Sequence, residues 1–190
     1  MIVIGDALDL ISSFDRRPFL VATDPPYAFG ADAKEHAISA TVAIVLRESA
    51  RKLQTGGWML VMCASSWRSV SYMIESVRGL VEPVRFGIWT KPKSRSKTRT
   101  PGWSWASVLV VAFRKGTSKE LPASGTLDHI EAPPVTTGRR AELPAIVADW
   151  MIAPFATPGE LLLDPFAGSG AIVAAAERAG MEAIGFERNP

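Results

Sequence analysis

Cysteine is nearly absent from this sequence of 190 residues, which contains a single cysteine, Cys63. One thiol forms no disulfide within the chain and cannot build a zinc site from several thiolates. The sequence therefore predicts a reduced, cytoplasmic setting rather than a disulfide-stapled domain. Cys63 lies inside the apolar run WMLVMC, and we expect it to be a small core residue rather than a catalytic thiolate.

Long apolar runs and a strong net charge are missing as well. No stretch approaches the roughly 20 apolar residues of a membrane-spanning helix. The apolar run at the N-terminus is interrupted at Gly5-Asp6, so no signal peptide is expected. The formal net charge of +2 indicates no particular partner. The two histidines, His36 and His129, are isolated, and we expect no catalytic role for either.

Short apolar, β-branched runs alternate with helical patterns along the whole chain. We predict strands over residues 2–4, 19–23, 58–63, 84–89, 108–113, 160–163 and 181–186. We predict a long loop over residues 114–138 and helices over 37–53, 66–80, 139–155 and 171–179. Pro144 is tolerated if it lies in the first turn of its helix. The alternation predicts one α/β domain, residues 1–190, with a mostly parallel sheet.

Polar motifs follow four of the predicted strands. They are Gly5-Asp6, Asp24 to Tyr27, Asp164 to Gly170, and Glu187. In parallel α/β sheets, ligands bind beyond the carboxyl ends of the strands. We therefore expect these four motifs to converge on one crevice.

The stretch LLLDPFAGSGAIVAAAERAG has the pattern of a strand, a glycine turn and a helix. Glu187 ends the next strand, where an acidic residue accepts hydrogen bonds from ribose hydroxyls. Val173 stands at the third glycine position of the dinucleotide fingerprint, which disfavours a dinucleotide-dependent oxidoreductase, and no Gly-Lys-Ser/Thr of a phosphate-binding loop is present. Asp164 before the glycines favours a cation. A nucleoside with a positively charged amino-acid tail fits this pattern best.

Together, DPPY (24–27) and DPFAGSG (164–170) resemble the S-adenosylmethionine-dependent amino-methyltransferases of DNA. The catalytic motif precedes the cofactor motif, which resembles the β-class order and implies a circularly permuted, Rossmann-like class I methyltransferase fold. GDALDL (5–10), IWTKPK (88–93) and GFERNP (185–190) resemble further segments of this family. The resemblance implies methyl transfer from S-adenosylmethionine to a DNA base in a bacterial or phage-infected cell.

The resemblance also implies a set of cofactor contacts. These are expected from Asp6, Ala7, Asp24, Asp164, Phe166, Gly168, Ser169, Gly170 and Glu187. Asp6 is expected to meet the cofactor's adenine amino group, and Glu187 its ribose. The family's His-Pro-Thr-x-Lys-Pro segment is matched best by residues 135–143, where Thr137 and Arg139 take the Thr and Lys places but the histidine and both prolines are missing.

The chain ends soon after Glu187, without the helix that the family places there. We expect this edge of the sheet to be bare, to be covered by a second copy of the chain or a partner subunit, or to be left open by a truncation.

The chemistry of the family explains the residues of Asp-Pro-Pro-Tyr. A nucleobase amino group is a poor nucleophile because its lone pair is conjugated with the ring. The Asp24 carboxylate and the Pro25 backbone carbonyl, held stiffly by Pro25 and Pro26, are expected to accept its two N–H bonds. Tyr27 is expected to stack on the flipped base. Neither a metal nor a covalent nucleophile is required. In this family Asp at the first position more often accompanies adenine.

A basic stretch, residues 91–105, contains no acidic residue. It predicts a flexible loop on a nucleic-acid backbone, the alternative being a solvated loop followed by core tryptophans. Its candidate nucleic-acid contacts are Lys91, Lys93, Arg95, Lys97, Arg99 and Trp103. The loop 114–138 is a second candidate contact.

These features favour a DNA adenine N6-methyltransferase. Cytosine 4-amino methylation and an RNA substrate are the alternatives among transferases. A different class of function is a cofactor-binding nucleic-acid module without turnover, or a subunit that needs a second chain.

Overall fold

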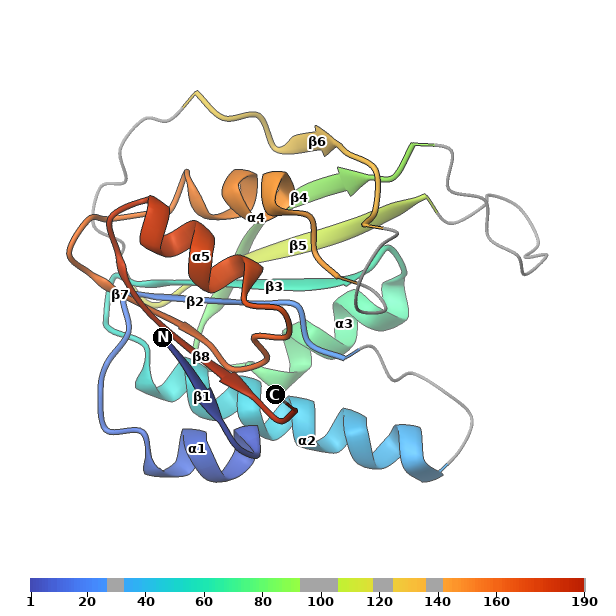
Figure 1. The fold of residues 1–190 in the computed structure, drawn as a ribbon. Helices are drawn as coiled ribbons and strands as arrows, with labels where there is room; N and C mark the ends of the chain where they lie inside the picture. The colour runs from blue at the N-terminus through green and yellow to red at the C-terminus, as the bar shows by residue number, and fades with distance from the viewer. Residues whose placement is uncertain (27–32, 93–105, 118–124, 136–141, 190) are drawn as a thin grey trace.

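The computed structural model describes residues 1–26, 33–92, 106–117, 125–135 and 142–189, with only the backbone described for 33–36. The described strands form one eight-stranded sheet in the order β1-β8-β7-β2-β3-β5-β4-β6 (Figure 1). The strands are β1 (Ile2–Ile4), β2 (Leu20–Thr23), β3 (Trp58–Ala64), β4 (Glu82–Thr90), β5 (Ser107–Arg114), β6 (His129–Glu131), β7 (Leu161–Asp164) and β8 (Glu182–Glu187). The helices are α1 (Ala7–Ser13), α2 (Ala33–Lys52), α3 (Trp67–Ser76), α4 (Ala145–Ile152) and α5 (Ala171–Arg178).

The centre of the sheet is parallel and fully buried. β2 lies between β7 and β3 and pairs with both in parallel, so that Leu20 stands opposite Leu162 on one side and Trp58 on the other. Every residue of β2 and β7 is buried, which matches the continuous apolar runs of strands that are covered on both faces. Among the described strands, β5 alone runs in the opposite direction. The predicted α/β fold with a mostly parallel sheet is confirmed.

Helices cover both faces of this sheet (Figure 1). The helices α4 and α5 pack on one face, where Val147 and Ile172 join the core. On the other face lie α1, α2 and α3, which contribute Ile11, Leu46 and Met73 to a second core. The two cores hold the strands rigidly, so the residues that follow the strands start from fixed positions.

The beginning and the end of the chain meet in one half of the sheet. β1 pairs in parallel with β8, with Ile4 opposite Glu187, and the Gly5 amide donates to the Glu187 carbonyl at 2.9 Å. The late strands β7 and β8 therefore lie beside the early strands β1 and β2. This arrangement confirms the predicted permuted order and brings Asp6 next to Glu187.

Several predicted boundaries are wrong. The helix α1 was not expected, and it forms because the Asp6 side chain caps it by accepting from the Leu8 amide at 2.9 Å. The expected loop 114–138 contains β6, which pairs with β4. The predicted helix 139–155 begins only at Ala145, because Pro144 is its N-cap residue with an extended backbone rather than part of the first turn.

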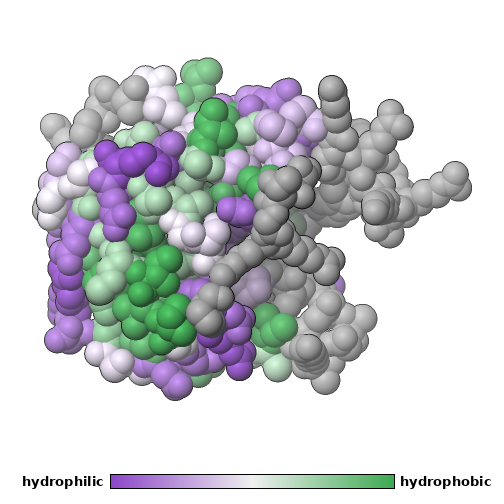
Figure 2. Space-filling model, viewed as in Figure 1, coloured by the Kyte–Doolittle hydropathy of each residue, from purple (hydrophilic) through white to green (hydrophobic). Residues whose placement is uncertain are grey.

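The outer face of β1 is apolar and exposed. Ile2 and Ile4 are 40% and 54% exposed, and Figure 2 shows hydrophobic residues gathered over this strand. The subunit predicted to cover this edge stays a prediction. Among the described residues, none of the helices combines the length and the apolar character needed to cross a membrane.

Candidate active site

The site lies where β2 and β7 end side by side. Each strand is followed directly by an Asp-Pro step, because β2 leads into Asp24-Pro25 and β7 ends at Asp164 before Pro165. The two strands pair in parallel, so their carboxyl ends reach the same edge of the sheet. We call this side of the sheet the carboxyl edge. β8 pairs in parallel with β7 and with β1, so Glu187 and Gly5-Asp6 reach this edge as well, and the predicted convergence of the four polar motifs is confirmed for their described residues.

Asp164 is the buried acid of the site. It has no exposed surface, and its Oδ1 atom accepts from the Thr23 hydroxyl at 2.7 Å and from the Phe166 amide at 3.1 Å. Its Oδ2 atom is buried with no hydrogen-bond partner among the described residues. Burial raises the pKa of Asp164 to about 7, with a further contribution from the nearby carboxylates of Asp24 and Glu187. The site therefore favours a positively charged ligand group.

Asp24 is partly exposed and borders two cavities. Pro25 after it is buried, whereas Pro26 is exposed and lines the larger cavity. Cys63 on β3 is fully buried, and burial, helped by the Asp24 charge, raises the pKa of its thiol to about 12. Cys63 is a neutral core residue, as the sequence predicted.

The glycine turn between β7 and α5 is braced by Glu187. Gly168 and Gly170 have φ angles of +55° and +83°, a region that favours glycine, and Gly170 is the N-cap residue of α5. The Glu187 Oε2 atom accepts from the Gly168 amide at 2.8 Å, and its Oε1 atom accepts from the Asn189 amide at 2.9 Å. The acid expected to bind ribose is thus fixed directly beside the turn.

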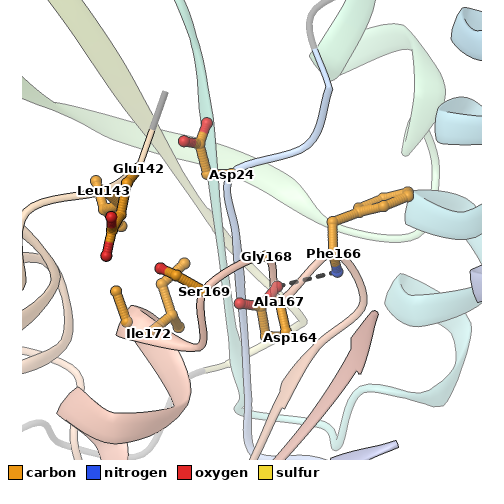
Figure 3. A pocket seen from close by; sticks show the side chains of 10 residues that line it. Asp24, Glu142, Leu143, Asp164, Phe166, Ala167, Gly168, Ser169 and Ile172 are labelled. Carbon is orange, nitrogen blue, oxygen red and sulfur yellow. Dashed lines mark hydrogen bonds between the residues drawn. The ribbon is translucent and has the colours of Figure 1, made fainter. Parts of the chain in front are cut away.

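The smaller cavity has a volume of about 130 Å³ and lies between the start of α5 and the residues before α4. Figure 3 shows the side chains of Glu142 and Ser169 turned toward this space, with Asp24 at its border. Sequence reasoning named Thr137 and Arg139 in the segment 135–143 but overlooked Glu142. Its position directly before Leu143-Pro144 and the helix was the available signal.

The larger cavity, of about 680 Å³, opens beside β8 and α2. Its walls combine apolar side chains with three carboxylates, those of Asp6, Asp24 and Glu187. A volume of several hundred Å³ with apolar walls and few polar groups suits a nucleoside-sized ligand. The Asp6 Oδ2 atom lies 3.9 Å from Nε of Arg188 while its Oδ1 atom caps α1.

The two cavities together contain most of the predicted cofactor residues. Those that line a cavity are Asp6, Ala7, Asp24, Asp164, Phe166, Gly168, Ser169 and Glu187. Gly170 lies at the start of α5 without lining either cavity. Thr137 and Arg139, as well as Tyr27, which was predicted to be catalytic, lie outside the described residues.

These features fit S-adenosylmethionine. The unpartnered Oδ2 atom of Asp164 and the neighbouring carboxylates suit the cationic methionine end. The larger cavity beside Glu187 suits the adenosine end. Among the described residues, no cluster of His, Cys, Asp and Glu side chains could hold a metal ion.

Lys91 follows β4 at the carboxyl edge. Its Nζ atom lies 4.3 Å from the centroid of the Trp89 ring, a cation–π contact. Partial burial lowers the pKa of Lys91, and the negative charge of Asp24 opposes this effect. The other predicted nucleic-acid contacts, Lys93, Arg95, Lys97, Arg99 and Trp103, lie outside the described residues.

Comparison with known proteins gives two kinds of match. A family model for N6/N4 methyltransferases, described as DNA methylase, matches residues 96–190, which is half of the chain. No curated protein sequence matches the chain significantly.

Three solved structures illustrate the likeness in fold, and each comparison covers 100% of this chain. M1.HpyAVI in complex with SAM has a TM-score of 0.79 at 21% identity over 92% of its chain. The cytosine-N4-specific PvuII DNA methyltransferase has a TM-score of 0.79 at 21% identity over 82% of its chain. A protein from Thermus thermophilus assigned as a DNA modification methylase, in complex with S-adenosyl-L-methionine, has a TM-score of 0.75 at 22% identity over 89% of its chain. The fold is that of the class I methyltransferases.

Proposed function

The chain belongs to the N6/N4 DNA methylase family, a family of S-adenosylmethionine-dependent DNA methyltransferases, and we propose that it methylates the 6-amino group of adenine. One observation carries the proposal. Asp24 borders both the small acidic cavity and the larger cavity, on the strand next to the one that ends at Asp164. The carboxylate that we propose as a hydrogen-bond acceptor for the substrate thus lies directly beside the site that fits the methyl donor.

The Asp24 carboxylate and the Pro25 carbonyl are proposed to accept the two N–H bonds of the target amino group. Two acceptors on one nitrogen localise its lone pair and orient it for attack. The buried ring of Pro25 and the adjoining Pro26 hold this backbone stiffly, so little reorganisation accompanies the reaction. Tyr27 is proposed to stack on the flipped base.

S-adenosylmethionine supplies an activated methyl group on its sulfonium. On the protein side, we propose that Asp164 and Ser169 contact the methionine end and that Glu187 accepts from the ribose hydroxyls. Asp6 and Ala7 line the larger cavity, where Asp6 is proposed to meet the adenine amino group of the cofactor. The remaining proposed contacts of the cofactor are Asp24, Thr137, Phe166, Arg139, Gly168 and Gly170.

We propose adenine rather than cytosine because the motif at residues 24–27 starts with Asp, which in this family more often accompanies adenine. The likeness in fold to a cytosine-N4-specific enzyme supports cytosine as the alternative target. DNA is the proposed partner, contacted by the segments 91–105 and 114–138 of a single domain, residues 1–190.

The test is transfer of tritium from labelled S-adenosylmethionine to DNA, with RNA of matched sequence as a second substrate. Digestion of the product to nucleosides identifies the methylated base. We expect N6-methyladenine with the wild-type chain and no label with Asp24→Ala. Label in N4-methylcytosine would replace the proposed target, and cofactor binding without transfer by the wild-type chain would favour a module without turnover.

A further inference from the structure

Trp67 is the most exposed large hydrophobic side chain in the part of the chain that the structure describes, with 84% of its surface accessible. It is the first residue of α3, and Arg68 beside it is exposed as well. Isolated aliphatic residues on a surface are ordinary, but a bare indole leaves one of the largest apolar side chains without a packing partner. Nothing proposed above uses either residue.

The backbone that presents Trp67 is held firmly. The Ser66 hydroxyl caps α3 by accepting from the Ser69 amide at 3.2 Å. One residue earlier, the Ser65 hydroxyl donates to the Ser107 carbonyl at 3.2 Å. The inner side of the same helix turn is buried through Ser69 and Val70. Trp67 is thus displayed on a rigid element, which keeps the entropic cost of a contact low.

The position of Trp67 relates it to the proposed DNA-binding side. β3, which leads to Trp67, is the neighbour of β2, and its last residues reach the same carboxyl edge as Asp24. Ser107 begins β5 at this edge, and the Lys91 amide donates to the Ala106 carbonyl at 2.7 Å where β4 ends. The basic segment therefore leaves and rejoins the sheet beside the start of α3 (Figure 1).

The charge directly beside Trp67 is positive. Arg68 has no acidic partner among the described residues, whereas Arg51 on α2 and Arg78 in the turn after α3 are paired with glutamates. Lys91 adds a second positive charge at the same edge, where β4 ends one strand beyond β5. The exposed acid Glu131 ends β6, on the far side of β4 from α3.

We propose that Trp67 stacks on a DNA base and that Arg68 contacts a backbone phosphate next to it. This inference rests on the proposed function, because removing the target base from the duplex exposes the faces of neighbouring bases. An indole stacks on any of the four bases, and an arginine binds a phosphate oxygen without reading sequence. The pair then adds affinity for opened DNA without setting the recognition sequence.

The test compares variants by fluorescence anisotropy with a labelled random-sequence duplex and a single strand of the same length. Trp67→Ala should weaken binding about 5- to 100-fold, the range found for loss of one base–aromatic stack. Trp67→Phe should retain most of the affinity, whereas Trp67→Leu, which is apolar but has no π face, should not. Arg68→Ala should make the salt dependence shallower by about one phosphate contact. Ile44→Ala, which removes a 47% exposed side chain of α2 outside the segments proposed to contact DNA, is the control.

A second readout is independent of affinity. DNA should protect wild-type tryptophan fluorescence from iodide quenching, and Trp67→Phe should lose part of this protection. All variants should bind S-adenosylmethionine as the wild type does. If the wild type binds DNA and Trp67→Ala binds it equally well, this inference is overturned while the proposed function stands. Equal binding by Trp67→Leu and Trp67→Phe would point to an apolar contact rather than a stack and would also overturn it. Absence of DNA binding by the wild type would overturn both.

Discussion

Two neighbouring parallel strands of this protein are each followed by an Asp-Pro step, and the two aspartates differ in how deeply they are buried. Asp164 after β7 is completely buried, and its carboxylate holds the Thr23 hydroxyl and the Phe166 amide. Asp24 after β2 is partly exposed and borders both cavities. Since Thr23 directly precedes Asp24, the buried acid also fixes the strand end that carries the exposed one. The two aspartates have similar local sequences. Their burial differs, and it leaves Asp164 to position its neighbours while Asp24 can contact a substrate.

The comparison predicts that Asp24→Asn lowers turnover far more than it lowers the affinity for the cofactor. Loss of one preorganised charge at the reacting group should lower methyl transfer by about 100- to 1000-fold. Tritium transfer measures the rate, and isothermal calorimetry measures the affinity for S-adenosylmethionine. Asp15→Asn, at an exposed position outside the site, should change neither quantity. A large loss of cofactor affinity with Asp24→Asn would show that the two acids do not divide their roles in this way.

DNA binding on the Asp24 side of the site should depend strongly on the salt concentration. Replacing the five cations of the basic segment with alanine should weaken DNA binding, with a loss of about 0.9 in the salt slope for each phosphate contact removed. These cations are Lys91, Lys93, Arg95, Lys97 and Arg99. Anisotropy titrations over a range of salt concentrations measure the slope. Replacing the ion-paired Arg51 and Arg78 is the control, and an unchanged slope in the five-fold variant would contradict the prediction.

The buried acid should make stability depend on pH. The folded pKa of Asp164 is about 7, above the value of about 3.9 for an unfolded chain. Between about pH 4 and about pH 7 the folded protein holds a proton that the unfolded chain has lost. The free energy of unfolding should therefore fall as pH rises through this window, by about 1 kcal/mol per pH unit.

Urea unfolding at several pH values measures this dependence. Asp164→Asn cannot ionise and should flatten it, whereas Asp15→Asn should preserve it. An equally steep fall in Asp164→Asn would assign the dependence to other groups.

Close packing under the glycine turn should contribute to the free energy of unfolding by a smaller but measurable amount. A Cβ atom at Gly185 would lie 2.7 Å from the Cβ of Ala167 and 2.8 Å from Cγ2 of Val173. Gly185→Ala should lower the free energy of unfolding by about 1–3 kcal/mol. Its matched control is Gly5→Ala, where the nearest atoms belong to the Leu10 side chain and can move aside. Equal stability of the two variants would contradict the prediction, because it would show that Ala167 and Val173 can move aside at little cost.

Much of the fold was predictable because its central strands are continuous apolar runs, and two of them, β2 and β7, end at an Asp-Pro step. The sequence predicted β2, β3 and β7 to within one residue at either end. It failed for β6, whose three residues His129–Glu131 carry no apolar pattern and form a strand only by pairing with β4. It also failed for α1, which is short and depends on the cap from Asp6.

The sequence predicted the motifs of the candidate site. It did not predict which of their residues are buried and which line a cavity. The strand ends that carry Asp24, Asp164 and Glu187 converge as the parallel topology requires. The inclusion of Glu142 in a cavity wall was not foreseen, because it depends on how the residues before α4 approach α5.

The sequence by itself determined that this is an α/β chain with an acid and prolines after one strand, an acid and a glycine turn after another, and a permuted order of the two. These features are local, since apolar runs, Asp-Pro steps and glycines act through neighbouring residues. Only the tertiary structure decided that Asp164 is buried while Asp24 meets the cavities, and that Trp67 is left bare at the carboxyl edge. The physical reason is that burial is set by elements distant in the chain, whose packing no short stretch of sequence specifies.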